Sequence, residues 1–182
     1  MSANTALLVI DVQIGLVDGG GAEPAYAGEQ MLTNINRLLT AARAAGTPVI
    51  YIKHDGGAGG RLEAGSPGWA IHPAIAPAAG ELVIRKRASD SFLDTPLQRE
   101  LAAQNITRLV ITGMRTEMCI DTTSRRAISE GYDVTLVGDA HATVDSEVLS
   151  AAQIIAHHNY TLDGFGTDAH EIAVRLASEV SF

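Results

Sequence analysis

The sequence predicts an α/β protein: one domain over residues 1–182, built as a three-layer doubly wound fold with a mainly parallel sheet. Short apolar runs rich in β-branched residues alternate with longer segments in which apolar residues recur at helical spacing. Runs that are apolar throughout are typical of strands covered by helices on both faces. No repeat, low-complexity tract or linker divides the chain, so we expect a single domain.

The predicted strands are short apolar runs bounded by turn residues or charges. They cover Ala6–Ile10, Pro48–Ile52, Leu82–Ile84, Arg108–Thr112, Asp133–Val137 and a last stretch near Tyr160–Leu162. Between the second and third lies a glycine-rich segment, Lys53–Gly80, whose length is typical of a functional loop. Its glycines match no phosphate-binding pattern, so we interpret it as a flexible loop or a lid.

The predicted helices follow the strands and begin or end at recognisable caps. They cover Glu29–Ala45, Pro96–Ala103, a segment from about Cys119 to Glu130, a segment from Asp145 towards His157, and about Asp168–Ser178. Gly46 ends the first of them, and Thr95 is the expected N-cap of the second. Asp145 is expected to cap the fourth, and Asp168 with Glu171 fits a capping box for the last.

Composition excludes some classes of function. The formal net charge is −8, which argues against a nucleic-acid partner, because phosphates require a surface rich in Lys and Arg. No apolar run is long enough to cross a membrane, and Met1–Thr5 lacks the features of a secretory leader. We therefore expect a cytoplasmic protein with a small-molecule substrate and no nucleic-acid or membrane partner.

Cys119 is the single cysteine, so the chain can form neither an internal disulfide nor a cysteine-rich zinc site. It follows a predicted strand and precedes a predicted helix. Free amides and the positive end of the helix dipole at such a turn favour a thiolate and can receive an oxyanion. Its neighbours Met118 and Ile120 are equally consistent with buried filler, and local sequence does not choose between these interpretations.

Asp11 and Lys86 lie at comparable positions after two other predicted strands. Each has an ordinary interpretation, Asp11 as a cap or turn residue and Lys86 as part of a solvated cluster with Arg85 and Arg87. Ligands and reactive groups in open α/β sheets gather beyond the carboxyl ends of the strands. The coincidence of three reactive residues in this class of position predicts an active site.

Motifs along nearly the whole chain resemble those of the isochorismatase-like cysteine hydrolases. They are Leu8–Gln13, Pro67–Pro73, Lys86–Phe92, Gly113–Cys119 and Gly131–Ala140, in the family's order. The resemblance implies the three-layer α/β fold of the isochorismatase-like hydrolases and homodimers or larger assemblies. It also implies a catalytic triad in which Asp11 is the general base, Lys86 the triad lysine and Cys119 the nucleophile. A cis peptide bond would lie between Met114 and Arg115, and the N–H groups of Arg115 and Cys119 would form the oxyanion hole.

Some relatives, the nicotinamidases, carry a metal on an Asp-x-His pair and a further histidine. Here Ile52 stands in place of that aspartate before His54, and His72 lies near the position of the further histidine. Two imidazoles without the carboxylate make a poor site, so we expect no metal and no cofactor, although Asp55 keeps a metal conceivable.

Gln13, Trp69 and Phe92 are candidate substrate-pocket residues. Trp69 and Phe92 are scarce aromatics in loops expected to flank the site, and Gln13 could orient Asp11 or touch substrate. The alternatives are loop anchoring for the two aromatics and a buried hydrogen bond for Gln13.

The expected activity is hydrolysis of a C–N bond in a small amide, lactam or carbamoyl compound, through a thioester on Cys119. Two alternatives stay open: a vinyl ether hydrolase, whose known examples generally lack the cysteine, and a metal-dependent nicotinamidase, disfavoured by Ile52. A non-catalytic binding protein on the same fold is disfavoured by the complete triad. Fold alone does not select a substrate.

Overall fold

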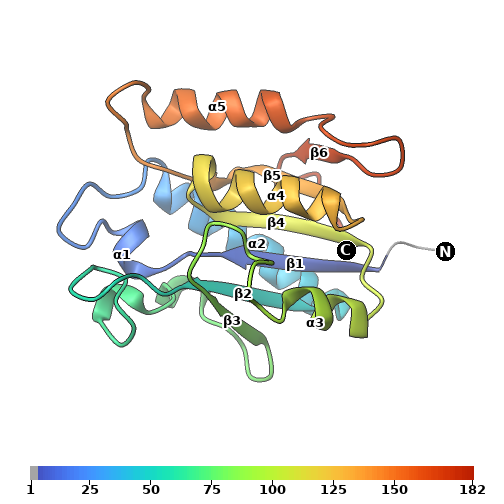
Figure 1. Cartoon of the computed structure of the whole chain (residues 1–182), viewed down its shortest axis with the longest axis horizontal. Helices are drawn as coiled ribbons and strands as arrows, with labels where there is room; N and C mark the ends of the chain where they lie inside the picture. The colour runs from blue at the N-terminus through green and yellow to red at the C-terminus, as the bar shows by residue number, and fades with distance from the viewer. Residues whose placement is uncertain (1–3) are drawn as a thin grey trace.

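The computed structural model describes residues 4–182. Met1–Ala3, part of the segment in which no secretory leader was expected, lie outside the described residues. Within 4–182, one sheet contains six parallel strands in the order β3-β2-β1-β4-β5-β6 (Figure 1). The strands are β1 (Thr5–Ile10), β2 (Val49–His54), β3 (Leu82–Lys86), β4 (Arg108–Met114), β5 (Asp133–Ala142) and β6 (Ile172–Arg175).

Helices cover both faces of this sheet, which confirms the predicted three-layer fold (Figure 1). The helices are α1 (Ile14–Val17), α2 (Gly28–Ala45), α3 (Leu97–Ala103), α4 (Asp121–Ser129) and α5 (Ala151–Leu162). One apolar cluster lies between the sheet and α2, and a second lies between the sheet and α3 and α4. Within the described chain, no helix is long and apolar enough to cross a membrane.

The central strand β1 is buried from both sides, as its uninterrupted apolar sequence predicts. Leu7 and Val9 belong to the cluster under α2, whereas Leu8 and Ile10 belong to the cluster under α3 and α4. Such alternation follows from the two-residue repeat of a strand. It anchors the backbone of β1 directly before Asp11.

The strand order reverses between β1 and β4, because the chain first builds β2 and β3 on one side of β1 and then β4, β5 and β6 on the other. A crevice at the carboxyl ends of the strands is expected at such a switch point. Asp11 follows β1 at this place, and the turn that carries Cys119 follows β4. The topology therefore brings the ends of two distant segments together.

Two predictions near the C-terminus are wrong. The stretch Tyr160–Leu162 is the last turn of α5 rather than a strand, and the expected helix Asp168–Ser178 contains β6 instead. The proposed capping box does not form, since the Thr167 hydroxyl accepts hydrogen bonds from the amides of Ala169 and His170. Pairing of β6 with the edge of β5 overrides the local helical pattern.

Cap positions also differ from prediction. Ser150 caps α5 in a capping box with Gln153, while Asp145 accepts a hydrogen bond from the Ala151 amide (2.7 Å) from outside the helix. Pro96 is the N-cap residue of α3, although the Thr95 hydroxyl still accepts from the Leu97 amide (3.3 Å). Both expected side chains satisfy helix-end amides, as predicted, but from one or more positions further upstream.

Candidate active site

Asp11 is fully buried at the end of β1. Its backbone is left-handed (φ 53°), and its N–H donates to the Ile52 carbonyl of β2 (2.9 Å). The adjacent residue on β4 must be a glycine, Gly113, because a side chain there would collide with the carbonyl of Ile10. Close approach of the two backbones therefore defines where the Asp11 carboxylate is held.

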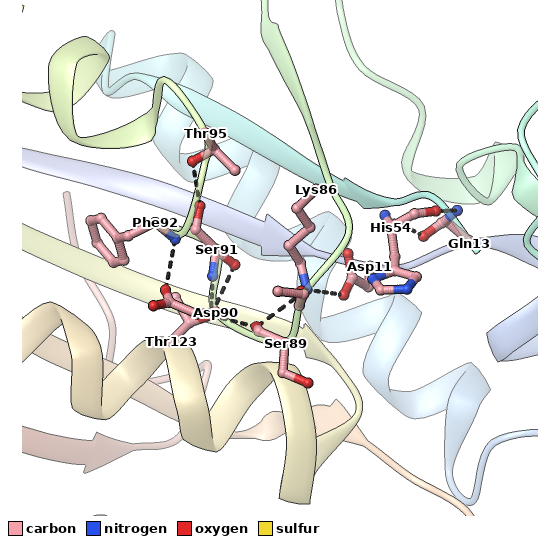
Figure 2. Close-up of polar contacts among 11 residues, drawn as sticks. Asp11, Gln13, His54, Lys86, Ser89, Asp90, Ser91, Phe92, Thr95 and Thr123 are labelled. Atoms are coloured by element: carbon pink, nitrogen blue, oxygen red, sulfur yellow. Dashed lines mark hydrogen bonds and ion pairs between the residues drawn. The ribbon is translucent and has the colours of Figure 1, made fainter. Parts of the chain in front are cut away.

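Lys86 reaches this carboxylate from the end of β3. Its Nζ lies 2.7 Å from Asp11 Oδ2, and both side chains are essentially inaccessible to solvent (0% and 1% exposed; Figure 2). The same ammonium donates to the carbonyls of Ala88 (2.9 Å) and Ser89 (3.3 Å). Three directed contacts hold the charge in one place, which is the condition for a buried ion pair to be tolerated.

Protonation in this pair reflects competition between burial and pairing. Burial raises the pKa of Asp11, and attraction to Lys86 and the neighbouring Cys119 thiol offset this only in part. Burial opposes the charge on Lys86, yet Asp11 and Cys119 together raise the pKa of Lys86 above its usual value. Lys86 therefore stays an ammonium at neutral pH, and the carboxyl group of Asp11 holds a proton more tightly than a free aspartate does.

Cys119 lies on the turn between β4 and α4. The Met114–Arg115 peptide bond is cis, and Thr116–Ile120 form one π-helical turn before α4 begins. The thiol is partly buried and interacts with both Asp11 and Lys86. The three residues selected from the sequence thus converge at the switch point of the sheet.

The amides and dipole of the turn alone would favour a thiolate, but the environment of Cys119 favours the protonated thiol. Burial, followed by the negative charge of Asp11, raises the pKa of Cys119 to about 12, although Lys86 acts in the opposite direction. The sequence argument considered only the turn's amides and dipole, and the carboxylate beside the thiol outweighs them. The site therefore favours a protonated thiol beside the Lys86 ammonium.

One backbone amide of the turn, that of Arg115, is available to an anion. Both the Met118 and Ile120 amides donate to the Arg115 carbonyl (3.1 and 3.2 Å), whereas no hydrogen bond within residues 4–182 uses the Arg115 N–H. An unpaired amide on the turn that carries the thiol is a feature that an oxyanion hole requires.

A second hydrogen-bond network joins the Lys86 loop to α4. The Ser91 hydroxyl bonds the hydroxyl of Thr123 (2.8 Å), and the Ser91 amide donates to the same oxygen (3.2 Å; Figure 2). Thr123 lies one helical turn beyond Cys119, so the network fixes the lysine loop relative to the helix that follows Cys119. The sequence interpretation missed Thr123, for which helical spacing from Cys119 was the only signal.

Gln13 has a structural role that the pocket prediction did not assign. Its side chain is buried, accepts from the His54 amide (2.9 Å) and donates to the carbonyls of His54 (3.0 Å) and Trp69 (2.9 Å). The carboxamide therefore ties the long 55–80 loop to the end of β2. These bonds correspond to the buried hydrogen-bond alternative.

The two aromatic candidates also serve as anchors. Phe92 is 8% exposed and stacks against Tyr132 within the core (centroids 6.0 Å apart), so it offers little surface for a substrate. Trp69 donates from its indole to Asp55 (2.8 Å), and the Lys53 ammonium lies 3.0 Å from its ring centroid. These contacts hold the long loop against β2.

His54 lies beside Asp11 and Lys86, in register with Lys86 across β2 and β3 (Figure 2). Burial lowers the pKa of His54; Asp11 raises it and Lys86 lowers it further, so the imidazole is neutral at pH 7. Asp55 is occupied by Arg85 (2.7 Å) and Trp69, and the His72 ring accepts from the Ala74 amide (3.2 Å). Within the described residues, no three His, Cys, Asp or Glu side chains are placed to hold a metal ion.

Comparison with known proteins identifies the family of this chain. Residues 5–163 match the family model of the isochorismatase domain. The chain is 41% identical over 140 residues to a streptothricin hydrolase of Streptomyces noursei, covering 77% of this chain and 55% of that protein. It is 29% identical to the ureidoacrylate amidohydrolase RutB of Methylobacterium radiotolerans, over 84% of this chain and 72% of that one.

Solved structures agree with this similarity. A putative isochorismatase hydrolase from Oleispira antarctica superposes with a TM-score of 0.88 at 34% identity, over 98% of this chain and 96% of that one. The match to the streptothricin hydrolases spans about half of their length. The family model covers most of the chain, and the same fold recurs in the solved relative. The chain belongs to the isochorismatase family.

Proposed function

We propose that this protein is a cysteine-dependent hydrolase that cleaves a C–N bond in a small amide, lactam or carbamoyl substrate. The observation that carries the proposal is the buried Lys86–Asp11 ion pair (2.7 Å) with the Cys119 thiol interacting with both partners. A buried charge pair costs desolvation energy and is weak evidence for stability alone. Its placement against a free thiol in the crevice favours catalysis.

In the acylation half-reaction, Asp11 accepts the thiol proton as sulfur attacks the substrate carbonyl carbon. The raised pKa of Asp11 suits it to this task, because it makes the carboxylate a stronger base than a free aspartate. The Arg115 and Cys119 N–H groups donate to the oxyanion of the tetrahedral intermediate. Collapse breaks the C–N bond, and Asp11 returns its proton to the leaving nitrogen.

In the deacylation half-reaction, water attacks the thioester carbonyl while Asp11 removes a proton from it. Collapse expels the sulfur of Cys119, which recovers the proton from Asp11, and the carboxylic or carbamic acid leaves. Lys86 remains an ammonium throughout and offsets the negative charge that moves between Asp11, sulfur and the oxyanion. The three groups titrate as one coupled unit.

The names of the relatives support C–N bond hydrolysis as the reaction class. Streptothricin hydrolase and ureidoacrylate amidohydrolase are names of enzymes that hydrolyse their stated substrates. The retained cysteine weighs against vinyl ether hydrolysis, and Ile52 with an occupied Asp55 weighs against a metal-dependent nicotinamidase.

The test is a screen of small amides, lactams and carbamoyl compounds for release of ammonia or amine, with Cys119→Ala as the control. A hit should give a thioester adduct on the intact protein, detectable by mass spectrometry after rapid acid quench and absent from the alanine variant. Full turnover by Cys119→Ser would contradict the covalent mechanism, since a serine hydroxyl is a far weaker nucleophile in this setting.

We also propose that the protein forms a homodimer or a larger homo-oligomer. The outer side of α5 supports this, because that helix carries no charged residue while Tyr160 (84%) and the nearby Val148 (86%) are exposed. Light scattering should find more than one copy per particle, and Tyr160→Glu should lower the mass. A monomer at micromolar concentration would refute the proposal.

A further inference from the structure

A second buried polar chain runs behind the nucleophile turn. The Thr116 hydroxyl lies 2.9 Å from His141 Nδ1, and His141 Nε2 lies 2.8 Å from Asn159 Oδ1. Thr116 is fully buried and His141 is 3% exposed. The chain therefore connects the first residue of the π-helical turn to β5 and then to α5.

Each hydrogen in this chain has one consistent position. Asn159 Nδ2 donates to the Gly138 carbonyl (3.0 Å), which leaves Asn159 Oδ1 as the acceptor facing His141. His141 must then carry its proton on Nε2 and accept at Nδ1 from the Thr116 hydroxyl. Burial lowers the pKa of His141 to about 4, which the Asn159 bond only partly opposes, so the ring stays neutral at neutral pH and keeps this tautomer.

The position of the chain relates it to the reacting groups. Thr116 directly follows Arg115, whose N–H is the unpaired amide, and precedes Cys119 by three residues on the same turn. His141 is in register with Gly113, so it lies at the base of the turn on the adjacent strand. Fixing Thr116 thus fixes the segment that presents both the amide and the thiol.

Thr143, the residue that directly follows β5, makes a second set of hydrogen bonds to the same turn. The Thr143 hydroxyl donates to Glu117 (2.6 Å) and accepts from Arg115 Nε (3.3 Å). The Arg115 and Glu117 side chains in these contacts are partly exposed, whereas the Thr116–His141 contact is buried. Loss of the Thr116 hydroxyl would leave His141 Nδ1 buried with neither a protein partner nor water to bond. The turn would then have to move to satisfy this atom.

We propose that Thr116, His141 and Asn159 are positioning residues that set the geometry of the nucleophile turn. The proposal rests on the proposed function, since it places Cys119 and the Arg115 N–H relative to a substrate carbonyl. None of the three touches the substrate in this scheme. Their loss should therefore lower kcat far more than it changes KM, and misplacement of about 1 Å can cost as much as 10²-fold.

The experiment compares three single-residue variants. Thr116→Val removes the hydroxyl and should lower kcat by about 10–10²-fold with little change in KM. Thr116→Ser keeps the hydroxyl and should restore most of kcat. Thr112→Val is the matched control, because Thr112 is also fully buried and donates to a backbone carbonyl, that of Leu8 (3.0 Å), away from the turn. It should lose stability without a comparable loss of kcat.

Two readouts do not depend on turnover. Two-bond ¹H–¹⁵N NMR correlations should show His141 protonated on Nε2 alone between pH 5 and 8, with the assignment disturbed in Thr116→Val. The rate of Cys119 alkylation by iodoacetamide should change in Thr116→Val and not in Thr112→Val. These measurements keep the proposal testable even if Thr116→Val folds poorly, because wild-type His141 can be examined alone.

The possible failures are distinguishable. Wild-type protein that releases no amine from any amide, or Cys119→Ser with full turnover, would overturn the proposed function. Equal loss of kcat in Thr116→Val and Thr112→Val, absence of rescue by serine, or His141 protonated on Nδ1 would overturn the positioning role.

Discussion

Two ion pairs lie on neighbouring residues of β3 and differ in nearly everything except distance. Lys86 meets Asp11 at 2.7 Å with side chains 0% and 1% exposed, and Arg85 meets Asp55 at 2.7 Å with side chains 53% and 8% exposed. Alternation along the strand points Lys86 inward and Arg85 outward. Adjacent positions on one strand therefore carry a solvated surface ion pair and a buried ion pair.

The difference shows that geometry alone does not define a functional ion pair. Water screens the Arg85–Asp55 pair, so its contribution to stability is small. The Lys86–Asp11 pair is not screened, and either charge would be severely destabilising if left alone. The outer pair and Trp69 secure the long loop, whereas the inner pair lies beside a thiol and transfers protons in the proposed mechanism.

The largest expected contrast is in turnover. Asp11→Asn should lower kcat by about 10²–10⁴-fold, because the amide cannot accept the thiol or water proton. Lys86→Met should also suppress turnover, whereas Arg85→Ala should stay close to the wild-type rate. Steady-state kinetics on a confirmed substrate gives the rates, and circular dichroism checks the fold. Near-normal turnover by Asp11→Asn would show that another group is the base.

The same site should respond non-additively. If Asp11 and Cys119 act as one unit, Asp11→Asn/Cys119→Ala should be scarcely slower than Cys119→Ala alone. Losses that add in free energy would instead mean that the two residues contribute independently.

Stability should separate the pairs next. Lys86→Met leaves the Asp11 carboxylate buried without its partner and should lower the free energy of unfolding by about 3–5 kcal/mol. Asp11→Asn/Lys86→Met removes both charges and should recover most of this loss without recovering activity. Arg85→Ala should have only a small effect. Urea unfolding at pH 7 measures all three, and equal losses in Lys86→Met and Arg85→Ala would remove the distinction.

The thiol predicts a smaller, pH-dependent effect. Its pKa is raised from 9.0 to about 12 in the folded protein, so the folded state holds the proton more tightly than the unfolded state does. The resulting stability is present below pH 9 and is lost as pH rises towards 12, with a slope of at most about 1.4 kcal/mol per pH unit. Cys119→Ala should lack this component. If the wild-type protein and Cys119→Ala lost stability identically between pH 9 and pH 12, the buried, protonated thiol would be contradicted.

No effect at all is expected from metal chelation. Asp55 is held by Arg85 and Trp69, Asp11 is paired with Lys86, and Ile52 supplies no ligand. The hydrolysis rate should be the same before and after dialysis against EDTA. Activity that is lost on chelation and restored by a single metal would overturn this interpretation.

Much of the fold could be predicted from local sequence. The apolar run Ala6–Ile10 and the periodic segment Glu29–Ala45 match β1 and α2 closely. A strand buried on both faces is apolar throughout, and a helix buried on one side repeats its apolar residues at helical spacing. The C-terminal segment could not be predicted in this way. Whether Ile172–Arg175 is a strand depends on an edge of β5 that the local pattern does not encode.

For the site, the motifs of the sequence determined which residues to consider: Asp11, Lys86 and Cys119. They did not determine the protonation of the thiol, which depends on how closely a buried carboxylate approaches it. The side chains of Gln13 and Phe92 are likewise used for loop anchoring and core packing, and Thr116 contacts His141 only because β5 lies beside the turn. The sequence records which side chains are available. Tertiary structure decides their pKa values and hydrogen-bond partners, because both depend on burial and on groups distant in the chain.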